Sequence, residues 1–231
     1  MNDSETDALD ALIVRNIVQV NAVWSRVQYG IGPRVLEAMD EAVKEWADAQ
    51  GWQGKFDSKE EWLWFAPRDW MVSGPEGKQD GHYAYLQLAT SGDEEGTESG
   101  DQDWLVTLLC AGVGSMGIRI FRGDDANIAR PVWRRLLATT EVVDAMVALG
   151  FVLEAREGSY FLRIPFEAAV LADGIEQNDL STFLVPLKEA LEKLPAVVAA
   201  MRPVMDVASK PADSGSREQP VADAKVLIPP T

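Results

Sequence analysis

The middle of the chain carries the pattern that most limits its fold. Between residues 61 and 121, short runs rich in β-branched and aromatic residues alternate with turns and loops that lack helical periodicity. Parallel strands need long, usually helical crossovers, whereas antiparallel strands are joined by short returns. The pattern therefore predicts an antiparallel meander with strands at residues 61–65, 82–88, 104–110 and 117–121.

Residues 1–50 have the periodicity of two helices. Ser4 with Asp7 resembles a capping box, and Gly and Pro residues at 29–33 suit a helix end followed by a new first turn. A helical hairpin over 1–50 is expected. The apolar stripes that define the two helices are Ile13, Ile17, Val20, Trp24 and Val27, then Leu36, Met39, Val43 and Trp46.

The second half of the chain returns to mixed structure. Helices are expected at 131–137 and 140–149, followed by a hairpin with strands at 151–155 and 160–164. The longest periodic stretch, within 179–206, contains three prolines and must therefore be a broken helical region. From residue 208 to 231 the composition is that of a disordered tail.

These elements predict an α+β fold in one domain over 1–207. An antiparallel sheet of about five or six strands, with inserted helices, occupies 60–165, and the N-terminal helical hairpin and the C-terminal helices flank it. The layout is similar in element order and charge to class I secretion chaperones, which are acidic proteins with helices at both ends of a twisted sheet. That resemblance implies a chaperone-like binding role.

Composition excludes several function classes. One Cys and one His among 231 residues exclude a disulfide scaffold and the zinc sites built from Cys and His. A net charge of −16 argues against wrapping nucleic acid or anionic lipid. The longest uncharged stretch, 105–118, is too short to span a bilayer, and no targeting segment is visible. We therefore expect a cytoplasmic protein with no membrane association, cofactor, metal or catalytic residue.

Three short motifs keep alternative functions open. The glycines of 112–117 match a dinucleotide-binding pattern, but a strand and not a helix is expected to follow them. Residues 131–164 have the element order of a winged helix, which leaves a DNA-binding regulator as an alternative. Glu76 and Lys78 superficially match a nuclease motif, and scattered Asp and Glu leave a metal-dependent hydrolase or nuclease as another.

Aromatic and acidic residues are the best candidates for a partner-binding surface. Six carboxylates and no base lie within residues 91–103, and three of the eight tryptophans lie within nine residues. Tryptophan anchors many interfaces, and an acidic loop suits a basic partner. The predicted partner-binding residues are Trp62, Trp64, Trp70, Asp93, Glu94, Glu95, Glu98, Asp101 and Asp103.

The basic residues cluster in one region, between residues 119 and 135. We predict a phosphate or anion site formed by Arg119, Arg122, Arg134 and Arg135, close to Arg130. The alternative is that these guanidinium groups pair within the chain, with the acidic loop of residues 91–103 and with Asp124 and Asp125.

The sequence thus favours a non-catalytic binding or regulatory protein of the chaperone, immunity or adaptor type. It would engage a protein partner through aromatic and acidic surface, and an acidic surface suits a basic partner. The stripes within 13–27 and 180–205 have heptad-like spacings, which also allow a homodimer.

Overall fold

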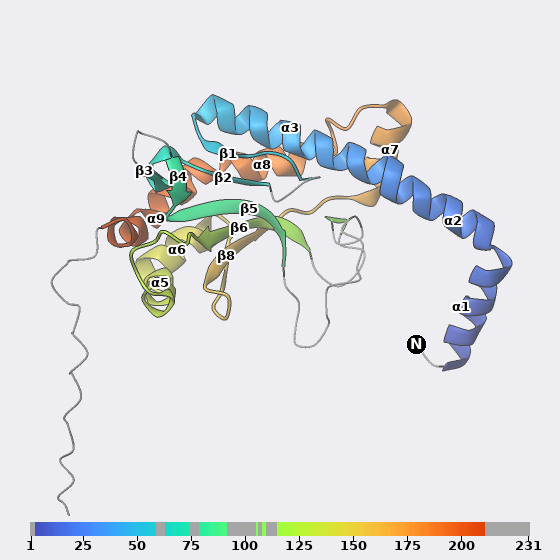
Figure 1. The fold of residues 1–231 in the computed structure, drawn as a ribbon, viewed down its shortest axis with the longest axis horizontal. Coiled ribbons are helices and arrows are strands. Elements are labelled where there is room, and N and C mark those ends of the chain that lie inside the picture. The colour runs from blue at the N-terminus through green and yellow to red at the C-terminus, as the bar shows by residue number, and fades with distance from the viewer. Residues whose placement is uncertain are drawn as a thin grey trace, which may run out of the picture.

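The computed structural model describes residues 3–58, 63–73, 79–91, 105, 108–109 and 115–210. Within these residues, a six-stranded antiparallel sheet packs against helices from both ends of the chain (Figure 1). The predicted α+β class is confirmed. No helix in the described part of the chain is long and apolar enough to cross a membrane.

The main sheet has the strand order β1-β2-β5-β6-β8-β7, with every neighbouring pair antiparallel. Two further strands, β3 and β4, pair with each other in a small second sheet. The longest ladder joins β5 to β6, where seven residue pairs run from Ala84↔Arg122 to Thr90↔Met116. The strands are β1 (Gln53–Lys55), β2 (Trp64–Ala66), β3 (Met71–Ser73), β4 (Gln79–His82), β5 (Ala84–Thr90), β6 (Met116–Arg122), β7 (Val152–Glu154) and β8 (Ser159–Arg163).

The two faces of the sheet have different surroundings because side chains alternate along a strand. On β6, Ile118 and Ile120 are buried in the main hydrophobic core, whereas Arg119 and Phe121 lie on the opposite face. The helices contribute the rest of the core, with α3 and α8 in contact on the same side of the sheet (Figure 1). The face that carries Arg119 is called the outer face below.

Helices from the N-terminus, the middle and the C-terminus of the chain build the helical layer. Helix α9 contacts α5, α6 and α8, which ties the inserted helices to the C-terminal region. The predicted broken helical region is a pair of helices separated at Lys193, with Pro186 and Pro195 in their first turns, whereas Pro203 lies inside α9 without ending it. The helices are α1 (Asp3–Arg15), α2 (Ile17–Arg26), the π-helix η1 (Val27–Ile31), α3 (Gly32–Gln50), the short 3-10 helix η2 (Arg68–Trp70), α5 (Arg130–Leu137), α6 (Thr140–Ala148), α7 (Ala168–Gln177), α8 (Val185–Glu192) and α9 (Leu194–Ala208).

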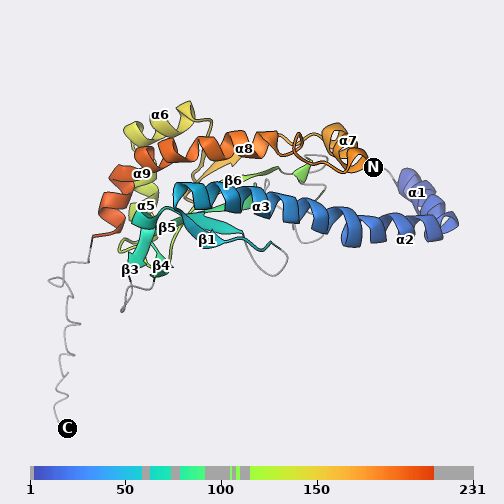
Figure 2. The ribbon, with the colours of Figure 1, turned by 90° about the horizontal axis from the view of Figure 1, so that it is seen from above.

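The turn predicted at 29–33 is wrong. Helix α2 continues through the π-helical turn into α3, because Ile31 and Gly32 both keep right-handed helical backbone angles. Pro33 does not break this continuous run, and it lies in the first turn of α3 directly after the π-helical turn, where Gly32 N–H donates to Val27 O. Figure 2 shows the result, in which α2 prolongs α3 away from the body instead of folding back on it.

Two further expectations differ from the structure. The strand predicted at 104–110 lies largely outside the described residues, but Leu109 N–H donates to Leu105 O at 3.1 Å, which is a helical turn. The strand was predicted because this segment is apolar. Leu105 and Leu108 are buried, so a buried helical turn accounts for the apolar residues equally well. Helix α7 was not expected from the sequence. The predicted tail lies outside the described residues from 211 onward.

One buried hydroxyl fixes β8 against α5 and makes stability sensitive to alkali. The Tyr160 hydroxyl donates to Leu137 O at 2.7 Å, and burial raises the pKa of Tyr160 from 10.0 to about 12. The contribution to stability is therefore complete below pH 10 and is lost as the pH rises from 10 to 12. By pH 11 the free energy of unfolding should fall by about 1 kcal/mol from this group alone.

Urea unfolding at pH 8 to 11 tests this prediction. Tyr160→Phe should be less stable than the wild type at pH 8 by about 1 to 2 kcal/mol, because Leu137 O loses its donor. The gap between the two proteins should narrow as the pH rises. A gap that stays constant from pH 8 to 11 would contradict the assigned role of Tyr160.

Candidate functional site

Four rings form a continuous strip on the outer face of the sheet. Trp64 contacts His82 with ring centroids 5.1 Å apart, His82 contacts Tyr85 edge to face at 4.5 Å, and Tyr85 stacks on Phe121 at 5.3 Å. All four residues are half-buried, so each ring keeps part of its surface in solvent. Trp64, His82, Tyr85 and Phe121 are called the aromatic row below.

Local structure explains why these rings meet. Tyr85 on β5 lies directly opposite Phe121 on β6, and Trp64 on β2 lies beside Gln87 on β5. His82 ends β4, and a bend at Tyr83 separates β4 from β5. The bend interrupts the side-chain alternation predicted for 82–88, so the imidazole reaches the ring of Tyr85 instead of sharing a face with Ala84 and Leu86.

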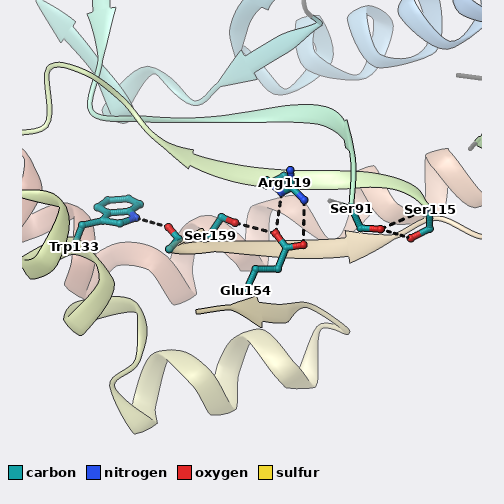
Figure 3. Close-up of polar contacts among 7 residues, drawn as sticks. Ser91, Ser115, Arg119, Trp133, Glu154 and Ser159 are labelled. Carbon is teal, nitrogen blue, oxygen red and sulfur yellow. Dashed lines mark hydrogen bonds and ion pairs between the residues drawn. The ribbon is translucent and has the colours of Figure 1, made fainter. Parts of the chain in front are cut away.

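An ion pair continues the outer face beyond the aromatic row (Figure 3). Arg119 donates to both carboxylate oxygens of Glu154, at 2.8 and 3.0 Å, and Ser159 Oγ donates to the same carboxylate at 2.9 Å. The guanidinium carbon also lies 5.7 Å from the ring centre of Phe121 and 5.2 Å from that of Phe161. This two-pronged pair neutralises Arg119 and holds β6, β7 and β8 together.

Carboxylates border the other end of the aromatic row. Asp125 Oδ2 accepts the backbone N–H of His82 at 3.1 Å, and both Asp124 and Asp125 are exposed. Burial lowers the pKa of His82 below its ordinary value of 6.5, and the charges of Asp125 and Asp124 oppose that shift. At neutral pH the end of the row therefore combines a neutral imidazole with two negative charges.

Phe121 also lines a cleft that gathers three arginines. The cleft has a volume of about 210 Å³, and its walls are formed by Phe121, Arg122, Arg130, Trp133, Arg134, Glu157, Gly158 and Ser159. Arg122 is used internally, because it donates to the carbonyls of Ala126 and Ile128 at 2.8 to 3.1 Å. Arg130 and Arg134 are exposed, so they are the guanidinium groups that can receive an anion here.

A tryptophan and a glycine position Arg134 in the cleft. Trp133 Nε1 donates to Gly158 O at 2.9 Å, which fixes α5 against the β7–β8 turn (Figure 3). Gly158 has φ +69°, and a Cβ built on it would lie 2.6 Å from Cγ of Arg134. Glycine is thus required both by the turn and by the arginine that packs on it.

The structure divides the predicted anion-binding residues. It brings Arg122 and Arg134 to one cleft together with Arg130, whereas Arg135 is exposed and does not line that cleft. Arg119 is paired with Glu154 on the outer face. Internal pairing therefore holds for Arg119, with Glu154 as its partner.

The predicted partner-binding residues are also divided. Trp64 lies in the aromatic row, but Trp70 is only 2% exposed and belongs to the hydrophobic core. Trp62 and the six carboxylates of 93–103 lie outside the described residues. Ser91 and Ser115 flank that segment, and Ser91 N–H donates to Ser115 O at 2.8 Å. The hydroxyl of Ser91 also lies 3.1 Å from that of Ser115 (Figure 3).

Sequence reasoning missed Tyr85 and Phe121 as members of a surface site. Their alternation with apolar neighbours was visible and placed them on one face of each strand. What no single strand reveals is that β5 and β6 pair in the register that puts the two rings opposite each other.

A second concavity, of about 410 Å³, is acidic. It is lined by Glu37, Asp40, Glu41, Lys44, Phe56 and Asp57. Asp40 is 9% exposed and accepts hydrogen bonds from the N–H and the hydroxyl of Ser58, so it has a structural role. Among the described residues, no group of three or more His, Cys, Asp or Glu is arranged to hold a metal ion.

No protein-family model, no curated protein and no solved structure matches this chain.

Proposed function

We propose that the chain is a non-catalytic binding protein that holds a basic segment of a protein partner on the aromatic row. The observation that carries the proposal is the strip of four partly exposed rings in mutual contact on the outer face, bordered by Asp124 and Asp125. Interfaces are enriched in such aromatic anchors, which bury much area at little cost in rotamer entropy.

The chemistry of the row favours cationic side chains. The faces of Trp, Tyr and Phe rings carry negative potential and attract Lys or Arg, and each such contact contributes roughly 0.5 to 2 kcal/mol. The carboxylates beside His82 and the net charge of −16 add attraction at long range. Arg119 does not oppose this, because Glu154 compensates its charge at 2.8 Å.

The winged-helix order of elements in residues 131–164 is accounted for by packing within the chain, without any role in DNA binding. Strands β7 and β8 of that segment are part of the main sheet, and α6 packs on α9. The nuclease-like residues Glu76 and Lys78 lie outside the described part of the chain. DNA binding and metal-dependent hydrolysis therefore remain alternatives that rest on the sequence alone. No contact among the described residues favours either of them.

A homodimer, the second kind of partner expected from the sequence, would need a different surface. The aromatic row is a narrow strip of four rings, whereas a stable dimer buries about 800 Å² on each copy. The N-terminal helices provide the larger apolar surface, and the aromatic row stays free for the partner segment.

Peptide binding tests the proposed function. We would titrate the full chain into labelled peptides of about 15 residues in which Arg and Lys alternate with Ser, and measure fluorescence anisotropy. Matched peptides with Glu in place of the cations are the control ligands. We expect binding of the basic peptides alone, weakened by added salt because exposed charges contribute.

Two variants with the same substitution locate the site. Tyr85→Leu keeps apolar bulk but removes a ring from the aromatic row, and should weaken the basic peptide roughly 5-fold or more. Tyr29→Leu removes a ring that is 84% exposed and lies in the N-terminal helical region, outside the aromatic row. This variant should bind the basic peptide as the wild type does. Equal affinities for basic and acidic peptides, or equal effects of the two variants, would contradict the proposal.

A further inference from the structure

The N-terminal helices expose most of the apolar surface of the described chain. Helix α2 has no buried residue, and Figure 2 shows α1 and α2 extending beyond the body of the protein. Apart from Val147, Val152 and Val185, every large hydrophobic residue that is exposed in the described residues lies between positions 9 and 29. These residues are Leu9, Leu12, Ile13, Val14, Ile17, Val18, Val20, Val23, Trp24 and Tyr29. Residues 6–31 are called the arm below.

The exposed area is that of an interface. Ten large side chains, between 37% and 84% exposed, present on the order of 1,000 Å² of apolar surface, against a few hundred Å² for the largest patch of a typical monomer. A standard protein interface buries about 800 Å² on each partner. The apolar area exposed over all faces of the arm is therefore comparable to one side of such an interface, and four of the ten side chains, Ile13, Ile17, Val20 and Trp24, belong to one stripe.

The apolar residues of the arm follow a heptad pattern. Ile13, Ile17, Val20, Trp24, Val27 and Ile31 recur at alternating spacings of four and three, as in the seam of a coiled coil. Val27 and Ile31 already pack against the core, and the stripe continues into α3 with the buried Val35 and Met39. The exposed seam is thus the continuation of a stripe whose other half is buried within the chain.

The charges along the N-terminal helices would be complementary if two copies of them paired antiparallel. Asp7 and Asp10 lie before the seam, whereas Arg15, Arg26 and Arg34 follow, with no acid between residues 11 and 36. A parallel pair would place the acidic ends together, whereas an antiparallel pair places them beside arginines. We propose that the arm pairs antiparallel with the arm of a second copy of this chain.

One register satisfies both the seam and the charges. If Val20 faces Trp24 of the other copy, Ile17 faces Val27 and Ile13 faces Ile31, so every seam residue meets a seam residue. The same register brings Asp10 opposite Arg34. The pairing uses the arms and leaves the aromatic row open, so it stands independently of the proposed function.

A pair of matched variants tests the seam. Val20→Asp places a charge in the proposed seam, whereas Val18→Asp places the same charge two residues away, at a side chain that is 75% exposed and lies outside the seam. Sedimentation velocity of the full chain from 1 to 100 μM should show a dimer of the 25.4 kDa chain for wild type and Val18→Asp. Val20→Asp should raise the dissociation constant roughly 100-fold or more.

Both variants should fold, because Val20 and Val18 are exposed in the single chain, and circular dichroism with thermal melting checks this. A wild type that stays monomeric at 100 μM overturns the proposal. Equal dissociation constants for the two variants overturn it as well. Monomers that co-sediment with anionic phospholipid vesicles would assign the arm to a lipid surface instead, which also overturns it.

Charge reversal tests the direction of pairing. Asp10→Arg and Arg34→Asp should each weaken the dimer, and the double variant should restore it to within about 3-fold of wild type. In a parallel pair Asp10 would face Asp10 of the other copy and not Arg34. Adding Arg34→Asp to Asp10→Arg would then not restore the dimer. A double variant no tighter than either single variant overturns the antiparallel register.

Discussion

Replacing Gly117 with alanine should strongly destabilise the main sheet. A Cβ at this position would lie 2.2 Å from Leu162 O and 2.5 Å from the ring of Phe161. The carbonyl of Leu162 belongs to the backbone of β8, which pairs with β6, so it cannot move away without breaking the ladder. We expect a loss of at least about 3 kcal/mol in the free energy of unfolding, or no folded protein.

Gly51→Ala is the matched control for this prediction. Gly51 ends α3 with φ +69°, but nothing lies within 4 Å of the Cβ position, so only backbone strain opposes the methyl group. The cost there should be about 1 kcal/mol. Urea unfolding of the three proteins compares them, and similar losses at both glycines would contradict the close approach at Gly117.

Truncating Trp133 should have the second large effect. Its side chain is 2% exposed, and its indole N–H donates to Gly158 O at 2.9 Å. Trp133→Ala removes a large buried volume and should lower the free energy of unfolding by about 4 kcal/mol. Trp133→Phe keeps much of the apolar contact but leaves Gly158 O without this donor, which should cost about 1 to 3 kcal/mol.

Thermal and urea unfolding measure both Trp133 variants. Val147→Ala, at an exposed valine on the neighbouring helix α6, is the control and should change stability by less than about 0.5 kcal/mol. If Trp133→Phe were as stable as wild type, the hydrogen bond to Gly158 would not hold the cleft together. The arginines of the cleft would then need another explanation for their placement.

Elements with a strong local signal were predictable from the sequence. The strand at 117–121 was found because a run with two isoleucines and a phenylalanine follows a glycine-rich turn, and the hairpin at 151–164 because a short turn separates two mainly apolar runs. The inserted helices were found from Pro131 and from the glycine that follows Leu149. Side-chain alternation and backbone conformation are set within a few residues, so a short window contains them.

The site could be predicted only in part, because it depends on residues distant in sequence. Trp64 was identified as a surface aromatic, but its neighbours in the row come from β4, β5 and β6. Trp70, from the same tryptophan cluster, is in the core. The sequence shows that aromatic residues are abundant, whereas the pairing of strands decides which of them share a face.

By itself, the sequence determined the α+β class, the antiparallel strands and the apolar stripe of the N-terminal helices, because each rests on local periodicity. Only the tertiary structure decided what each stripe packs against. The stripe of α3 is buried in the core, and that of α2 is exposed, since Ile31 and Gly32 keep helical backbone angles and the chain does not fold back. Likewise, Glu154 neutralises Arg119 because β6, β7 and β8 are neighbours. Burial and pairing depend on which surfaces meet in space, and that is not contained in any local pattern.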